Sequence, residues 1–103
     1  NKNLNLLSDP LAGVKNSNCI MTDVWLSMGD KNKSKIKYFK NFTINKKIID
    51  SASKDVIFMH CLPANRGQEV TSDVLDGKNS IVLQQAKNRM YIQQAILLYV
   101  IKK

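Results

Sequence analysis

Long apolar runs and cysteines are scarce in this chain of 103 residues, whose length allows one small domain. The longest apolar run, residues 95–101, is far shorter than the roughly 20 residues that cross a bilayer. Cys19 and Cys61 are too few for a disulfide framework, and no cysteine or histidine spacing suits a zinc site. Residues 1–8 lack the basic-then-apolar layout of a signal peptide. We therefore expect a cytoplasmic protein with reduced thiols, no metal and no membrane contact.

Glutamate and arginine are also rare. Glu69 is the only glutamate and only two arginines occur, while sixteen basic and eight acidic residues give a net charge of +8. Such a charge is compatible with nucleic-acid binding. However, the lysines are spread from Lys2 to Lys103, and two arginines supply few forked phosphate contacts. No nucleic-acid partner is expected, although a basic nucleic-acid-binding module stays an alternative.

Short apolar segments alternate with helix-forming ones along the chain. We expect strands at residues 4–7, 19–22, 55–59 and 80–83, with 19–22 buried on both faces. We expect helices at residues 10–15, from a cap at Asp30 to about Asn41, after a cap at Asn45, at 72–75 and at 85–101. This alternation predicts an α/β fold, with a parallel sheet flanked by helices.

Three segments follow predicted strands, where open parallel sheets bind their ligands. They are residues 23–29, 60–63 and 84–89. The only tryptophan, the only histidine and one of the two arginines all fall within them. The sequence therefore predicts a site at this edge of the sheet.

The first segment combines a carboxylate with a possible anion holder. Asp23 can hold an ammonium group, whereas backbone N–H groups near Ser27 and Met28, before a helix start, favour a carboxylate. Together they suit an amino acid. The alternative is that Asp23 and Ser27 cap local turns and Trp25 fills the core.

The other two segments carry further candidates. Cys61 is a nucleophile, a proton acceptor or a substrate contact, or else an inert buried thiol. His60 is a ligand, an acid–base group or a hydrogen-bonded structural residue, and the Leu62–Pro63 bond is a candidate cis bond. Arg89, expected in the first turn of the last helix, suits a phosphate or a polarised carbonyl; otherwise it faces solvent beside a carboxylate.

Three blocks at these positions resemble the ornithine carbamoyltransferase family. They read DVWLSMG at residues 23–29, HCLPANRGQEVT at 60–71 and AKNR at 86–89, in the order of the family. The cysteine of the second block differs from the proline of the aspartate-specific relatives, and the first block points to ornithine. The resemblance implies a Rossmann-like ornithine-binding domain, transfer of the carbamoyl group of carbamoyl phosphate to L-ornithine, no cofactor and a trimer.

The resemblance also implies roles for individual residues. Asp23 would bind the amino end of ornithine, and Ser27 and Met28 its amino-acid head. Cys61 would contact the reacting centre and help to take the proton from the attacking amine. Cys61 and Leu62 would contact the carbamoyl group, and Arg89 would reach carbamoyl phosphate.

The chain departs from the family pattern in two ways. Lys87 stands where the family usually has Glu, and Asn65 replaces a common His. The family's Ser-Thr-Arg-Thr phosphate loop does not occur in these residues. We therefore expect residues 1–103 to be a partial C-terminal ornithine-binding domain that is inactive alone. A relative using another acceptor, such as N-acetylornithine, or a non-catalytic remnant stays an alternative.

Overall fold

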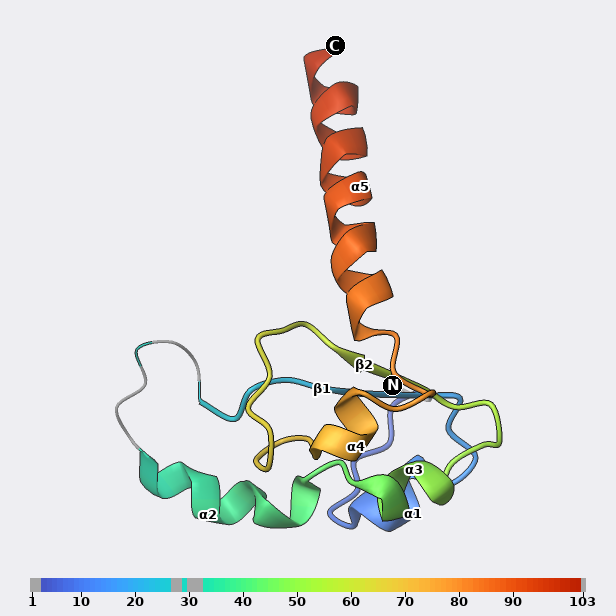
Figure 1. Ribbon diagram of the computed structural model, residues 1–103, viewed down its shortest axis with the longest axis vertical. Helices are drawn as coiled ribbons and strands as arrows, with labels where there is room; N and C mark the ends of the chain where they lie inside the picture. The colour runs from blue at the N-terminus through green and yellow to red at the C-terminus, as the bar shows by residue number, and fades with distance from the viewer. Residues whose placement is uncertain (1–2, 27–28, 30–32, 103) are drawn as a thin grey trace.

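A two-stranded parallel sheet lies at the centre of the computed structural model, which describes residues 3–26, 29 and 33–102. The elements in chain order are α1 (Pro10–Val14), β1 (Cys19–Thr22), α2 (Ile36–Phe39), α3 (Lys46–Asp50), β2 (Ile57–His60), α4 (Ser72–Leu75) and α5 (Val82–Ile101). In Figure 1, α1, α3 and α4 lie on one side of the strands, and α5 rises from the other side. The prediction of an α/β fold with a parallel sheet flanked by helices is confirmed.

The caps of the short helices lie where the sequence predicts them. The Asp9 carboxylate accepts a hydrogen bond from the N–H of Leu11 at the start of α1, and Pro10 occupies the first position of that helix. The Asn45 side chain accepts from the N–H of Ile48 in α3. Local capping therefore fixes both helix starts.

The strands pair in register, with Cys19 opposite Ile57 and Thr22 opposite His60. On its other edge β2 meets a single residue, Ser80, beside Phe58. The N–H of Phe58 donates to Asn79, and the Phe58 carbonyl accepts from Ile81. Strand β2 is therefore central, and the two strands end at the same edge.

The core lies on one face of the sheet, beneath β2. Its buried side chains are Ile20, Ile44, Ile48, Ile49, Val56, Phe58, Val70, Val74, Leu75 and Val82. On the opposite face of the strands, Cys19, Met21 and Ile57 are exposed. The prediction that residues 19–22 are buried on both faces is therefore wrong, because the described helices α1, α3 and α4 cover only one face.

Two predicted strands do not form. Residues 4–7 have no strand partner among the described residues, and their three leucines are exposed. Residues 80–83 give one bridging residue and then helix α5, because the Ile81 carbonyl already accepts the helical N–H of Gln85. An apolar run forms a strand only where a neighbouring chain pairs its backbone groups.

Several predicted boundaries also move. Strand β2 begins at Ile57, two residues later than expected. The lysine-rich helix is reduced to α2 between 3₁₀ turns at Lys33–Lys35 and Lys40–Phe42, since like charges this close destabilise a long helix. Its predicted cap, Asp30, lies outside the described residues. Of the helices that the structure describes, none combines the length and apolarity needed to cross a membrane.

Candidate functional site

The residues that follow β1 and β2 meet at the shared edge of the sheet. Because Thr22 pairs with His60, the next residues of the two strands, Asp23 and Cys61, are neighbours. The Cys61 thiol donates a hydrogen bond of 2.9 Å to Oδ1 of Asp23. The same oxygen accepts from the N–H of Val24 at 2.7 Å. Both side chains are exposed, so the pair is open to a ligand.

This contact sets the charges of both groups. The hydrogen bond from Cys61, helped by the N–H of Val24, holds the pKa of the Asp23 carboxyl below its usual range. The bond to Asp23 raises the pKa of the Cys61 thiol, and the nearby charge of Arg89 opposes that rise. At neutral pH the pair is therefore a carboxylate beside a protonated thiol.

A cavity of about 690 Å³ opens next to Cys61. Its lining residues are Cys61, Leu62, Pro63, Gln85, Ala86, Arg89 and Ile92. The volume is in the range of small-molecule sites. The cavity is therefore large enough for a metabolite placed between the end of β2 and helix α5.

Helix α5 supplies the positive charge of this cavity. Arg89 is the eighth residue of α5, just after its second turn, so the prediction that it lies in the first turn is wrong. The helix starts earlier than expected because the chain turns into it directly after Ser80. Arg89 is exposed and has no ion-pair partner among the described residues. Its guanidinium is available to an anion.

The predicted candidates of the first segment are only partly visible. Ser27 and Met28 lie outside the described residues, and their roles stay predictions. Trp25 stacks on Phe39, with ring centroids 5.8 Å apart, and so joins the loop after β1 to helix α2. Among the residues that the structure covers, no group of three or more His, Cys, Asp or Glu side chains forms a metal site.

A buried polar pair lies directly behind the site. Nε2 of His60 is 3.2 Å from Oε1 of Glu69, and both side chains are fully buried. The Leu62–Pro63 bond is cis, as the sequence suggested. The side-chain oxygen of Gln85 accepts a hydrogen bond from the N–H of His60. Sequence reasoning assigned no role to Glu69 or to Gln85. The one available signal was that Glu69 is the only glutamate.

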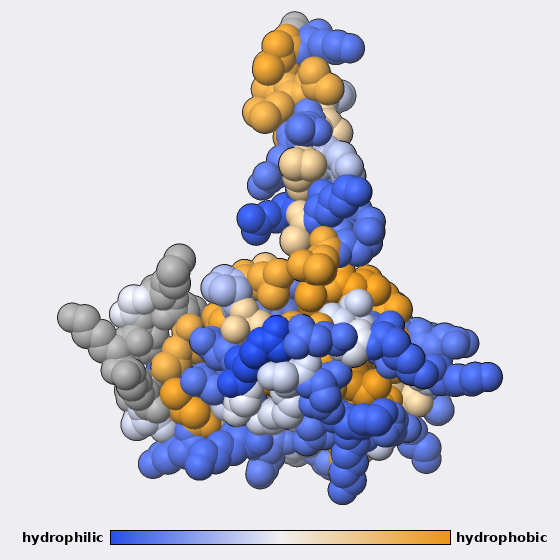
Figure 2. Space-filling model, in the orientation of Figure 1, coloured by the Kyte–Doolittle hydropathy of each residue, from blue (hydrophilic) through white to orange (hydrophobic). Residues whose placement is uncertain are grey.

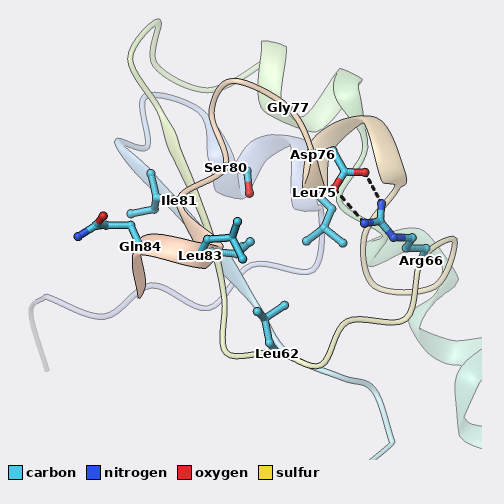
Figure 3. A pocket seen from close by; sticks show the side chains of 10 residues that line it. Leu62, Arg66, Leu75, Asp76, Gly77, Ser80, Ile81, Leu83 and Gln84 are labelled. Carbon is cyan, nitrogen blue, oxygen red and sulfur yellow. Dashed lines mark hydrogen bonds and ion pairs between the residues drawn. The ribbon is translucent and has the colours of Figure 1, made fainter. Parts of the chain in front are cut away.

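A second cavity, of about 460 Å³, also has Leu62 among its lining residues (Figure 3). At one end of it Arg66 points toward Asp76, and both terminal nitrogens of its guanidinium donate to the carboxylate. This bond raises the pKa of Arg66 and lowers that of Asp76. Because the charge of Arg66 is already matched, the cavity of Cys61 and Arg89 is the better candidate for an anionic substrate.

Comparison with known proteins identifies the family. A family model described as the aspartate/ornithine carbamoyltransferase, Asp/Orn binding domain, matches residues 1–100. The chain is 48% identical over 102 residues to an ornithine carbamoyltransferase of Methanococcus vannielii. The aligned region covers 96% of this chain and 33% of the relative.

Solved structures agree with that match. An ornithine carbamoyltransferase of Pyrococcus furiosus has a TM-score of 0.81 at 48% identity, over 88% of this chain and 30% of that one. The anabolic ornithine carbamoyltransferase of Campylobacter jejuni has a TM-score of 0.84 at 36% identity, over 92% and 32%. The chain spans about a third of the length of these relatives. It belongs to the aspartate/ornithine carbamoyltransferase family.

Proposed function

We propose that the protein containing this chain transfers the carbamoyl group of carbamoyl phosphate to the side-chain amine of L-ornithine, giving L-citrulline and phosphate. Residues 1–103 would be part of its C-terminal, ornithine-binding domain. A phosphate loop outside these residues would complete the site, in a trimer that needs no metal or cofactor. Family membership and the similarity to named ornithine carbamoyltransferases support this proposal.

One observation carries the proposal: the Cys61–Asp23 contact lies at the end of β2 beside the cavity that Arg89 lines. The pair supplies a negative charge and a sulfur that can take up a proton once it is ionised, and the arginine supplies a positive charge. A carbamoyl donor with a phosphate group needs the positive charge, and an amine acceptor needs the other two groups. The arrangement therefore suits reaction between an amine and an anionic acyl donor.

The charge of Asp23 favours an acceptor with a free ammonium group. Because the pKa of Asp23 is lowered, the carboxylate stays ionised at neutral pH and attracts the amino end of ornithine. Acetylation would remove that charge and leave the carboxylate without a cationic partner. We therefore favour ornithine over N-acetylornithine.

The same carboxylate controls when Cys61 accepts a proton. While Asp23 is free, it keeps the thiol protonated. A substrate ammonium on Asp23 would offset the negative charge, so that Arg89 then favours the thiolate, which forms when the thiol releases its proton to solvent. The thiolate could take the proton released as the amine nitrogen bonds to the carbamoyl carbon and the bond to the phosphate oxygen breaks. Leu62 and Arg89 would hold the carbamoyl phosphate meanwhile.

The test measures product formation by the complete enzyme. With carbamoyl phosphate it is expected to form citrulline from L-ornithine, but no product from N-acetylornithine or L-aspartate. The 103-residue chain alone is expected to form none. Preference for another acceptor, or citrulline from the isolated chain, would contradict the proposal.

A matched pair of variants assigns the effect to Asp23. Asp23→Asn is expected to lower kcat/KM for ornithine by about 10- to 100-fold, the usual effect of losing a hydrogen bond to a charged group. The control is Asp50→Asn, which removes an exposed carboxylate of α3 that pairs with Lys46. The control should behave as the wild type does.

A further inference from the structure

The most deeply buried polar side chains of the described residues are His60 and Glu69, which are 1% and 0% exposed. The proposed reaction uses neither of them. A buried carboxylate costs free energy unless hydrogen bonds compensate it, and one of its oxygens, Oε2, has no partner among the described residues. A pair this costly suggests a task beyond packing.

The backbone of the site determines which ring nitrogen of His60 carries the proton. The N–H of Leu62 donates to Nδ1 of His60 at 2.8 Å. An amide N–H can only donate, so Nδ1 is the acceptor and the ring proton is on Nε2. Nε2 then donates to Oε1 of Glu69 at 3.2 Å. The carboxylate thus holds the imidazole in the one tautomer that can accept from Leu62.

The pair connects both walls of the cavity. Oε1 of Glu69 also accepts the N–H of Asn65 at 2.6 Å, so it fixes both ends of the segment between His60 and Asn65. The N–H of His60 donates to the side chain of Gln85 at 3.0 Å, and Gln85 belongs to α5, as Arg89 does. One histidine therefore links the Cys61–Leu62 backbone to the helix that carries the arginine.

We propose that His60 is a positioning residue: its Nδ1 holds the Leu62 amide, and Glu69 holds the tautomer, so that Cys61 and Leu62 face the cavity. This inference rests on the proposed function. Neither side chain touches substrate. A merely structural pair would instead affect folding, and any loss of activity would follow the loss of folded protein.

Two variants of the complete enzyme test the roles of the two ring nitrogens of His60 separately. In His60→Gln the terminal amide N–H lies near the position of Nε2 and can still donate to Glu69, but nothing accepts from Leu62. In the double variant His60→Asn with Glu69→Gln, the Asn oxygen lies near the position of Nδ1 and accepts from Leu62. The double variant also contains no buried carboxylate without a partner.

The two variants are expected to differ in kcat. His60→Gln should lose about 100-fold, the scale for a reacting group displaced by about 1 Å, while KM for ornithine changes little. The double variant should keep most of the wild-type kcat. Equal losses, or losses that follow the drop in Tm, would overturn the inference. If His60→Gln does not fold, the double variant alone decides, since it must then stay active.

A second readout needs no turnover. Alkylation of Cys61 by iodoacetamide, followed by mass spectrometry, reports how firmly the thiol is held by Asp23, and exposed Cys19 is an internal reference. His60→Gln should speed alkylation of Cys61 relative to Cys19, while the double variant should not. An unchanged rate in His60→Gln would refute the positioning role even if the wild type forms citrulline. A faster rate in an enzyme that forms none would refute only the proposed reaction.

Discussion

Strand β2 and helix α5 both contain many apolar residues, but they use them differently. Phe58 of β2 is 0% exposed and has packing neighbours from several elements. In α5 only Val82 is buried, whereas Leu97 is 60% exposed and the last two turns are apolar on every side. Figure 2 shows apolar side chains at both ends of α5, with polar ones between them. The strand is therefore stabilised by the core, and the helix by its own hydrogen bonds and by its attachment at Val82 and Gln85.

The two elements therefore differ in role: β2 belongs to the stable core, and α5 presents a side chain to the candidate site. Strand β2 positions Cys61 through the core beneath it, whereas α5 presents Arg89 from a helix with almost no tertiary support in the described residues. A helical segment that is apolar all round, as residues 95–101 of α5 are, is typical of one enclosed by a larger protein. This agrees with relatives about three times as long as the chain.

The largest expected effect comes from the core under β2. Phe58→Ala should destabilise the 103-residue chain by about 3–5 kcal/mol, because it removes a fully buried ring and leaves a cavity. Urea unfolding followed by circular dichroism measures the change. If the free energy of unfolding falls by less than about 1 kcal/mol, the core beneath β2 is not the main source of stability, and the contrast between β2 and α5 is wrong.

The next effect concerns α5 and appears in activity. Arg89→Met in the complete enzyme should lower kcat by about 100-fold, the scale for losing one donor to developing negative charge. Its stability should hardly change, since Arg89 is exposed and unpaired among the described residues. Kinetics beside thermal melting provide the measurement. Equal damage to both properties would mean that Arg89 supports the fold rather than the substrate.

Local signals made much of this arrangement predictable. Asp9 and Asn45 cap helices through side chains close to them in sequence, and the parallel pairing of β1 with β2 places Asp23 beside Cys61. The three segments of the predicted site thus meet at one sheet edge wherever the structure describes them. The catalytic and binding roles stay predictions.

The failures have a common physical cause. Residues 4–7 and 80–83 have strand-like composition, but a strand also needs a partner, which a local pattern does not reveal. The burial of Glu69 depends on His60, nine residues earlier and on another element. Composition alone would place the only glutamate on the surface.

A smaller effect should appear in the pH dependence of folding. The lowered pKa of Asp23 stabilises the fold above about pH 3.9, and this contribution is lost as pH falls through the folded pKa. The raised pKa of Cys61 stabilises the fold below about pH 8.5, and this contribution is lost as pH rises through the folded pKa. Asp23→Asn should therefore make the Tm of the chain depend less on pH, at both the acidic and the alkaline end of the range.

The control for this profile is Asp50→Asn, which leaves the Asp23–Cys61 bond intact. Its Tm should follow that of the wild type at alkaline pH. An alkaline limb unchanged by Asp23→Asn would mean that the thiol–carboxylate bond does not link the ends of β1 and β2.

The smallest expected effect lies at the far end of α5. Leu97→Ala should change the free energy of unfolding of the chain by less than about 0.5 kcal/mol, because the side chain is mostly exposed and alanine favours helix. The same substitution in the complete enzyme should cost about 2–5 kcal/mol if other parts of the protein enclose this helix there. Urea unfolding of both forms gives the two values. Equal small values would mean that α5 stays exposed in the enzyme, and its apolar surface would then need another explanation.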